Sequence, residues 1–306
     1  MNTSSSVSTS CELTVIIATT CSEIRTESIW RAINSILAAE KTLKIRIIAI
    51  VNGTRFDKKL LDSLLKHPKI EVHHQAEANL PLALYSGVSL VKTDFFCFLD
   101  DDDEMLPRGL EYRVGVLKSM PEFDAVVTDG VEIEGDIERS SVGQWDHIRI
   151  DPIGSLIKKN WLASCGGTYR TERVKKSIWK DLPKYYEWTT VAFRLAKANQ
   201  IYFSSKQTFL VHSTPQSLSK RPDYILTAPR ALELILREVS DREISRHMKK
   251  KIASACHTAA DFCLTQNRPI DAWKYHIECL VRWGGWRFLP YTRHLLLARN
   301  YKRTRT

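Results

Sequence analysis

The chain has 306 residues, of which 43% are hydrophobic and 26% charged, and this balance predicts an ordinary soluble globular protein with one large or two small domains. No uninterrupted apolar run approaches the roughly 18 residues of a membrane span, and the seven cysteines form no C-x-x-C pair that would indicate a zinc site or a disulfide framework. The formal net charge of +10 favours anionic partners, which include nucleic acid, anionic lipid and nucleotide phosphates.

The first residues have the composition of a tail. Residues 1–10 are rich in Ser and Thr and contain neither the basic nor the apolar region of a signal peptide. We therefore expect residues 1–11 to be a disordered tail. Dispersed cysteines favour reduced thiols, so we expect a cytoplasmic location.

Four short apolar runs then alternate with helical patterns. The runs cover residues 13–18, 45–51, 70–73 and 95–99 and have the length and β-branched or aromatic content of buried strands. Between them, apolar residues recur at helical spacing over about 27–40, 60–65 and 82–91. Strands that alternate with helices through short connections are typical of a parallel, doubly wound sheet, so we predict an α/β fold.

The pattern is more varied after residue 107 and becomes helical towards the end. We expect a helix from Pro107 through Leu117, a strand at 125–129, a polar loop at 140–151, a short helix at 152–159, a glycine-broken strand or turn at 165–169, a helix at 187–198, and strands at 201–203 and 208–212. Helical periodicity then covers 226–239, 244–264 and 270–283. We therefore predict one α/β domain over 12–215 and a helical C-terminal region over 216–306.

The fourth apolar run ends abruptly in acidic residues, Asp100 to Asp103 followed by Glu104. Parallel sheets bind ligands at the carboxyl ends of their strands. Adjacent carboxylates repel one another, so their ionisation is costly unless a cation neutralises them. Mn²⁺ and Mg²⁺ prefer carboxylate oxygens, and Mg²⁺ often shares them with substrate phosphates, which predicts a divalent metal and a nucleotide here. The alternative is a solvated acidic loop that caps the next helix.

Taken together, several of these segments resemble glycosyltransferase family 2. The resemblance lies in the strand 14–19, the helical residues 32–37, the strand end 51–54, Gly87 with Val88, and the run 98–103 followed by Pro107 and Leu110. It covers about residues 12–215. It implies the GT-A fold, a doubly wound, mostly parallel, Rossmann-like sheet with a nucleotide-binding half over 12–110 and an acceptor half over 111–215.

The resemblance also implies an activity. Such enzymes move a sugar, with inversion, from a nucleotide-diphosphate donor to a hydroxyl of a glycan or lipid-linked acceptor, here in bacterial-type cell-surface polysaccharide or lipopolysaccharide synthesis. Mn²⁺ or Mg²⁺ would stabilise the charge of the leaving diphosphate. Two rival readings remain: a haloacid-dehalogenase-type phosphatase, whose acidic motif follows its first strand, and a GT-A protein that binds sugar nucleotides without catalysis. We expect no nucleic acid partner, because a nucleic-acid-binding motif is missing from the sequence.

Site residues follow from the same resemblance. It assigns donor binding to Thr19, Asn52, Asp100 and Asp101, metal binding to Asp102, Asp103 and His212, and the general base to Glu187. The structural alternatives are a helix-start glutamate for Glu187 and a strand-end histidine for His212.

Three departures from the family pattern accompany these assignments. Trp188 stands where the family has an aspartate beside the base, and Asn52 replaces an acidic residue. The arginine that the family often has before Gly87 is missing from this sequence, so the metal or a distant basic residue must meet the charge of the diphosphate.

Variable loops build the acceptor site in such enzymes, and we expect the segments 132–150 and 161–182 to serve here. Asp129, after the strand at 125–129, could line this acceptor region or cap a turn.

The last residues have a composition of their own. In residues 282–306, which begin with Arg282 and end with Thr306, the charged residues are all Arg or Lys, and Trp283, Trp286, Phe288 and Tyr291 lie among them. Basic residues beside aromatic ones are typical of segments that lie on an anionic membrane. This composition predicts peripheral docking on the inner face of the plasma membrane, and the alternative is a helical cap whose aromatic side chains pack within the protein.

Overall fold

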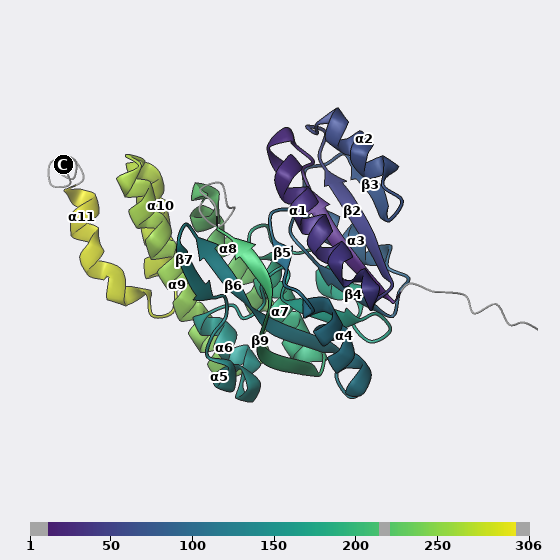
Figure 1. The fold of residues 1–306 in the computed structure, drawn as a ribbon. Helices are drawn as coiled ribbons and strands as arrows, with labels where there is room; N and C mark the ends of the chain where they lie inside the picture. The colour runs from purple at the N-terminus through teal and green to yellow at the C-terminus, as the bar shows by residue number, and fades with distance from the viewer. Residues whose placement is uncertain (1–11, 214–220, 298–306) are drawn as a thin grey trace, which may run out of the picture. The chain divides into compact units, whose positions relative to one another are not determined.

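The computed structural model describes residues 12–213 and 221–297, without the side chains of residues 40 and 41 (Figure 1). The expected tail 1–11 and the last part of the basic segment, 298–306, lie outside these residues. The described chain forms two compact units. The first comprises residues up to 152, 160–182 and 191–213, and the second comprises 153–159, 183–190 and the residues after 213.

The first unit begins with the predicted alternation of strands and helices. The strands are β1 (Leu13–Thr19), β2 (Ile45–Asn52), β3 (Ile70–Gln75) and β4 (Phe95–Phe98), joined through α1 (Thr26–Leu37), α2 (Lys58–Lys66) and α3 (Leu80–Ser89). Short 3-10 helices, η1 (Glu23–Arg25) and η2 (Ala38–Lys41), flank α1. All four strands pair in parallel, in the order β3-β2-β1-β4, which confirms the predicted parallel sheet in this half.

Burial explains why β1 lies inside this sheet. Val15, Ile16 and Ile17 are fully buried, so both faces of the strand are covered. A Cβ atom on Gly87 would lie 2.4 Å from Cγ2 of Ile16, which shows that α3 packs closely on β1. This close approach explains the glycine in the middle of α3.

The second half of the sheet mixes strand directions. It contains β5 (Glu104–Met105), β6 (Ala125–Glu134), β7 (Ile137–Ser140), β8 (Gly167–Arg170) and β9 (Ile201–His212), with the helices α4 (Gly109–Ser119), α5 (Trp145–Ile150), α6 (Pro152–Lys158) and α7 (Glu187–Ala198) and the 3-10 helix η3 (Lys176–Trp179) in the intervening chain. The described strands continue in the order β4-β8-β6-β9-β5, and β7 pairs with β6. β6 runs parallel to β9, whereas β8 is antiparallel to both β4 and β6.

Two predictions in this half are wrong. The expected loop at 132–150 contains the end of β6, the strand β7 and the helix α5, because a hairpin forms between residues 131 and 140. The expected separate strands at 201–203 and 208–212 are a single strand, β9. The pairing of β9 with β6 shifts register after Thr128 and again after Asp129, so a bulge accommodates the polar residues in the middle of β9.

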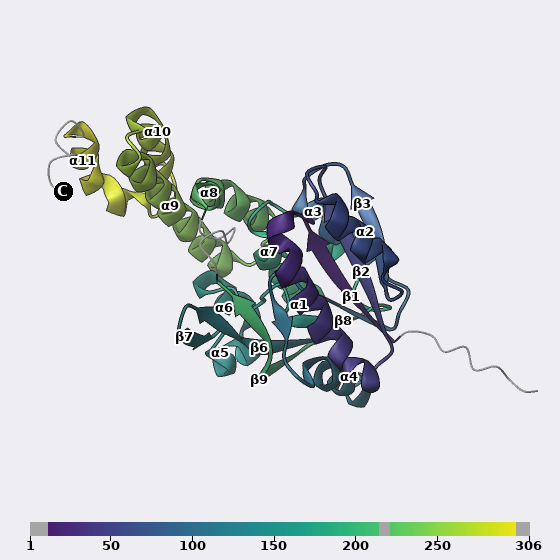
Figure 2. The same cartoon turned by 45° about the horizontal axis from the view of Figure 1, so that its top comes forward.

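The second unit contains the predicted C-terminal helices, α8 (Pro222–Arg237), α9 (Arg242–Thr265) and α10 (Pro269–Leu280), followed by the 3-10 helix η5 (Gly285–Tyr291) and α11 (Thr292–Leu296). Figure 2 shows α9 and α10 side by side, and Cys263, Ala272 and Leu295 form part of a small core there. Helices of the length and apolarity needed to cross a membrane do not occur in the described part of the chain.

Candidate functional site

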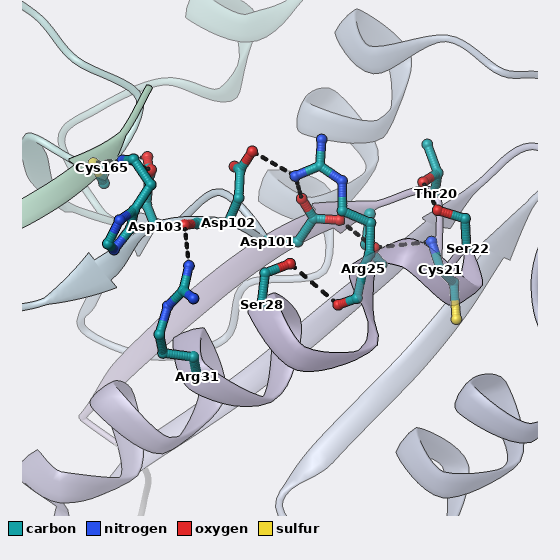
Figure 3. A network of polar contacts seen from close by, with 12 residues as sticks. Thr20, Cys21, Ser22, Arg25, Ser28, Arg31, Asp101, Asp102, Asp103 and Cys165 are labelled. Atoms are coloured by element: carbon teal, nitrogen blue, oxygen red, sulfur yellow. Dashed lines mark hydrogen bonds and ion pairs between the residues drawn. The ribbon is translucent and has the colours of Figure 1, made fainter. Parts of the chain in front are cut away.

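The acidic run lies at the carboxyl edge of the parallel sheet. Asp100 to Asp103 follow β4, and β4 pairs with β1 up to Phe98, opposite Ile16. The segment after β1 therefore lies beside the acidic run, as Figure 3 shows for η1 and the start of α1. Asp101 and Asp103 are only 7% and 3% exposed, so the alternative of a solvated acidic loop is wrong for these two residues.

Three carboxylates of this run face one another. One oxygen from each of Asp100, Asp102 and Asp103 lies within 4.8 Å of the others. Burial, then repulsion by Asp102, raises the pKa of Asp100 to about 7, and burial, then repulsion by Asp100, holds the pKa of Asp103 well above its usual value. Three carboxylates this close repel one another when all are ionised, and a bound cation would relieve that repulsion. Their oxygens are ligands that Mg²⁺ and Mn²⁺ accept, so the residues fit a divalent metal.

Two arginines meet the acidic run, and we did not identify either of them from the sequence. Arg25 Nη1 lies 3.1 Å from Asp101 Oδ1 and also pairs with Asp102. Arg31 Nε lies 3.0 Å from Glu104 Oε1, and its Nη2 donates to the backbone carbonyl of Asp102 at 3.0 Å. The predicted strand order could have indicated them, because basic residues just after β1 come close to acidic residues just after β4 if the two strands are neighbours in the sheet.

The four residues assigned to donor binding take different positions. Asp100 belongs to the group of three carboxylates, whereas Asp101 accepts a hydrogen bond from Thr19 Oγ1 at 2.6 Å. Burial raises the pKa of Asp101 to about 6, although Arg25 and Thr19 oppose this shift. Thr19 thus holds Asp101, and a direct contact from Thr19 to a donor stays a prediction.

Asn52, at the end of β2, holds the chain that leads into α3. Its Oδ1 accepts from the backbone N–H of Asn79 at 2.7 Å and from Nε2 of Gln75 at 3.1 Å. Asn79 in turn caps α3 by accepting from the N–H of Leu82 at 3.1 Å. Asn52 therefore positions this segment through its carbonyl oxygen, and its role in donor binding stays a prediction.

His212 contacts the acidic segment through its side chain and its backbone, and its role as a metal ligand stays a prediction. Its Nε2 lies 2.7 Å from Glu104 Oε1, while its backbone N–H donates to Asp103 Oδ1 at 3.1 Å. The imidazole is not part of the group formed by Asp100, Asp102 and Asp103. Cys165 also donates to Asp103, with 3.6 Å between Sγ and Oδ2, so Asp103 is held on two sides.

Glu187 belongs to the second unit and is the first residue of α7. The alternative of an exposed helix-start glutamate is correct about its position at the start of α7 and wrong about its exposure, which is 5%. Burial raises its pKa, opposed by hydrogen bonds from the backbone N–H groups of Glu187 and Tyr185. Tyr185 has φ +70°, a conformation that is costly for a residue with a side chain. A raised pKa is appropriate for a carboxylate that must accept a proton near neutral pH.

Asp129 lies within β6 and not in a loop, so the alternative of a loop aspartate that caps a turn is wrong, and its role in lining an acceptor region stays a prediction. Its Oδ1 accepts from the N–H groups of Gly130 at 2.8 Å and Val142 at 3.1 Å. Its Oδ2 accepts from Ser140 Oγ at 2.7 Å and from Trp145 Nε1 at 3.1 Å. The buried carboxylate therefore joins β6 to the end of β7 and the start of α5.

Comparisons with known proteins agree with this fold. The family model described as Glycosyl transferase family 2 matches residues 14–179. The structure of S. aureus TarS 1-349 is similar with a TM-score of 0.54 and 14% identity, over 86% of this chain and 80% of that one. TarS 1-349 in complex with UDP-GlcNAc has a TM-score of 0.55 and 15% identity, over 85% and 75%. The complex with UDP also has a TM-score of 0.55, with 14% identity over 95% and 91%.

No curated protein matches the chain. At these identities the solved structures bear on the fold alone. They confirm the predicted GT-A fold, in which the acidic run follows the fourth strand of the sheet.

Proposed function

Because this chain belongs to glycosyl transferase family 2 and is therefore a glycosyltransferase, we propose that it transfers a sugar, with inversion, from a nucleotide-diphosphate donor to a hydroxyl of a glycan or lipid-linked acceptor. The observation that carries the proposal is the group of three carboxylates, Asp100, Asp102 and Asp103, at the carboxyl end of β4. The similar protein TarS, solved with UDP and with UDP-GlcNAc, supports a nucleotide-sugar donor.

The carboxylates would hold Mn²⁺ or Mg²⁺, which would stabilise the charge that develops on the leaving diphosphate. Thr19 and Arg25 hold Asp101 beside these ligands, and Cys165 and the backbone of His212 hold Asp103. Glu187 would take the proton of the attacking hydroxyl as general base, because its raised pKa suits that role.

The proposal divides the chain into a donor half over residues 12–110, an acceptor half over 111–215 and a helical region over 216–306. It places the enzyme in bacterial-type synthesis of cell-surface polysaccharide or lipopolysaccharide.

The test is donor turnover by the full chain. Purified protein, stripped with EDTA, is incubated with a panel of nucleotide sugars with and without MnCl₂, and the release of nucleoside diphosphate is measured. We expect turnover of one donor that requires the metal and falls at least 100-fold in Asp102→Asn, since that variant loses a charged ligand.

The matched control is Asp271→Asn, because the Asp271 side chain is 41% exposed, pairs with Arg268 and lies in α10, outside the segments expected to bind donor or acceptor. Failure of every donor to turn over, with nucleotide binding intact in both variants, would establish the non-catalytic sugar-nucleotide-binding alternative. Metal-independent turnover, equal in Asp102→Asn, would refute the metal site.

The second part of the proposal concerns the partner of the C-terminal unit. Ile270, Ile277 and Val281 are 84%, 56% and 78% exposed, and their spacing of seven and four residues puts them on one face at α10. Trp283 and Trp286 follow with 58% and 77% exposure. An apolar face of this kind is unusual on a protein surface and marks an interaction site.

The partner that fits this face is an anionic membrane. Arg287 and Arg293 are exposed in the same segment as these Trp residues, and Asp and Glu do not occur in residues 282–306. Phe288 and Tyr291, in contrast, pack inward on His257, with ring centroids 4.2 and 4.7 Å away. The predicted docking segment therefore offers its tryptophans, and not all of its aromatic residues, to a bilayer on the inner face of the plasma membrane.

Flotation with liposomes tests this docking. The full chain should float with vesicles containing phosphatidylglycerol and remain below with pure phosphatidylcholine, and the double variant Trp283→Ser, Trp286→Ser should lose flotation. Phe288→Leu, a change in an inward-facing ring, is the matched control. No flotation of the wild type, together with a concentration-dependent dimer that the double variant abolishes, would instead assign the face to a second copy of the chain.

A further inference from the structure

Arg25, the last residue of η1, bridges two aspartates of the acidic run (Figure 3). Its Nη1 atom lies 3.1 Å from Asp101 Oδ1 and also forms an ion pair with Asp102 Oδ2. The Arg25 side chain is 28% exposed, so one side of it contacts the protein and the other remains accessible. A guanidinium thus neutralises carboxylates at the place where the proposed function puts a metal and a diphosphate.

The two aspartates differ in their other partners. Asp101 is held by Thr19 Oγ1 at 2.6 Å and lies outside the group of carboxylates that fits a metal. Asp102 belongs to that group, and its Oδ2 is the atom that Arg25 contacts. Arg25 is therefore paired with Asp101, which Thr19 also holds, and with Asp102, which would bind a metal.

A divalent metal and a guanidinium compete for the oxygens of Asp102. Metal binding at this carboxylate would weaken the pair with Arg25, because the two cations would share the charge of one carboxylate and repel each other at this distance. Asp101 would still hold Arg25 near the site. The released N–H groups would then be available to phosphate oxygens, which guanidinium groups bind well through two parallel hydrogen bonds.

The sequence creates a need for such a group. An arginine is missing before Gly87, where it would have met the charge of the diphosphate, and the residues there are Leu84, Tyr85 and Ser86. The geometry points to Arg25 as the replacement. This inference rests on the proposed function. Arg25 is a counter-ion that Asp101 tethers at the site: it pairs with Asp102 while no metal is bound, and it binds the donor diphosphate when a metal binds Asp102.

Arg31 provides an internal comparison. It pairs with Glu104 Oε1 and with the backbone carbonyl of Asp102, neither of which is a carboxylate oxygen of the group that fits a metal. A metal on the Asp102 carboxylate therefore does not compete with Arg31 for an atom. Of these two arginines, Arg25 is the one that combines a proposed metal ligand with an anchor outside the metal group.

This role has a signature that a structural role lacks, because the two affinities change in opposite directions. Loss of the guanidinium removes a competitor from Asp102, so Arg25→Gln should bind Mn²⁺ about 3- to 10-fold more tightly than the wild type. The same variant should bind a nucleoside diphosphate, in saturating MnCl₂, at least about 10-fold more weakly. A residue that only supports the local fold would weaken both affinities.

Isothermal titration calorimetry on the full chain measures both affinities. The first titration uses MnCl₂ alone, and the second uses whichever of UDP, GDP and dTDP raises the melting temperature of the wild type most. Arg46→Gln is the charge-matched control, because Arg46 pairs with Glu71 across β2 and β3 and should change neither affinity. Arg25→Lys keeps the charge, so it should retain nearly wild-type Mn²⁺ affinity and lose part of the nucleotide affinity.

Three results would overturn the inference. In the first, the wild type binds both Mn²⁺ and a nucleoside diphosphate, and Arg25→Gln changes neither affinity. In the second, Arg25→Gln and Arg25→Lys each weaken both affinities. In either case the proposed function stands and Arg25 is not a counter-ion switch. If the wild type binds neither Mn²⁺ nor any of the nucleoside diphosphates, the proposed function fails together with the inference.

Discussion

Replacement of Asp129 should lower the free energy of unfolding by about 3–5 kcal/mol in Asp129→Ala. The carboxylate is 4% exposed and accepts four hydrogen bonds, two from backbone N–H groups, one from the Ser140 hydroxyl and one from the Trp145 indole. A buried donor that loses its partner costs about 1–3 kcal/mol. The Ser140 hydroxyl can rotate and water can enter the space left by the carboxylate, so the total is smaller than four full penalties.

Urea denaturation, followed by tryptophan fluorescence and far-UV circular dichroism, measures this loss. Asp129→Asn keeps the size and one acceptor oxygen, so it should cost about 1–3 kcal/mol. The exposed Asp146 is the control, and Asp146→Ala should change the free energy of unfolding by less than about 0.5 kcal/mol. A loss below about 1 kcal/mol in Asp129→Ala would refute the argument that this carboxylate organises the β6–β7 hairpin and the start of α5.

The other predictions concern packing, acid–base chemistry and helix capping. Gly87→Ala should destabilise the protein by about 1–3 kcal/mol in urea, because its Cβ would lie 2.4 Å from Ile16 Cγ2, and an unchanged midpoint would contradict the packing of α3 on β1. Burial raises the pKa of Glu187, so transferase activity should fall on the acid side with a midpoint above the ordinary pKa of a glutamate. The Glu187→Gln variant should be inactive at every pH, and a wild-type pH profile with its midpoint at the ordinary value would exclude Glu187 as the base. Asp241→Ala should lower the free energy of unfolding by about 0.5–2 kcal/mol, because Asp241 Oδ1 accepts from the N–H of Ile244 at 2.8 Å and so caps α9. Asp241→Asn keeps the acceptor oxygen, so it should leave the melting temperature of the protein unchanged.

The secondary structure was predictable where local pattern and burial agree. The parallel strands β1, β2 and β4 are mostly buried, so their apolar runs are continuous, whereas the edge strand β3 is mostly half-buried. The helices α1 and α2 are amphipathic and have one apolar face. The prediction failed for β9, where the exposed residues 205–207 lie between the buried pairs 203–204 and 208–209 of one strand. It failed again for 132–150, because the hairpin and α5 depend on contacts with Asp129 that no local pattern reveals.

The candidate site divides in the same way. The acidic run could be placed at the end of the fourth strand because its apolar and charged residues are adjacent in the chain. The partners of the run could not, since Thr19 is 82 residues from Asp101 and His212 is 109 residues from Asp103. Arg25 is 77 residues from Asp102 and belongs to no motif.

The sequence by itself therefore determined the fold class, the family and the position of the carboxylates, because each of these depends on the order of residues along one strand and its neighbours. Only the tertiary structure decided how the carboxylates are used. It separated Asp101, held by Thr19, from the group of Asp100, Asp102 and Asp103, and it brought Arg25 to both. The physical reason is that electrostatic pairing depends on distance in space, and β1 and β4 become neighbours only when the sheet forms.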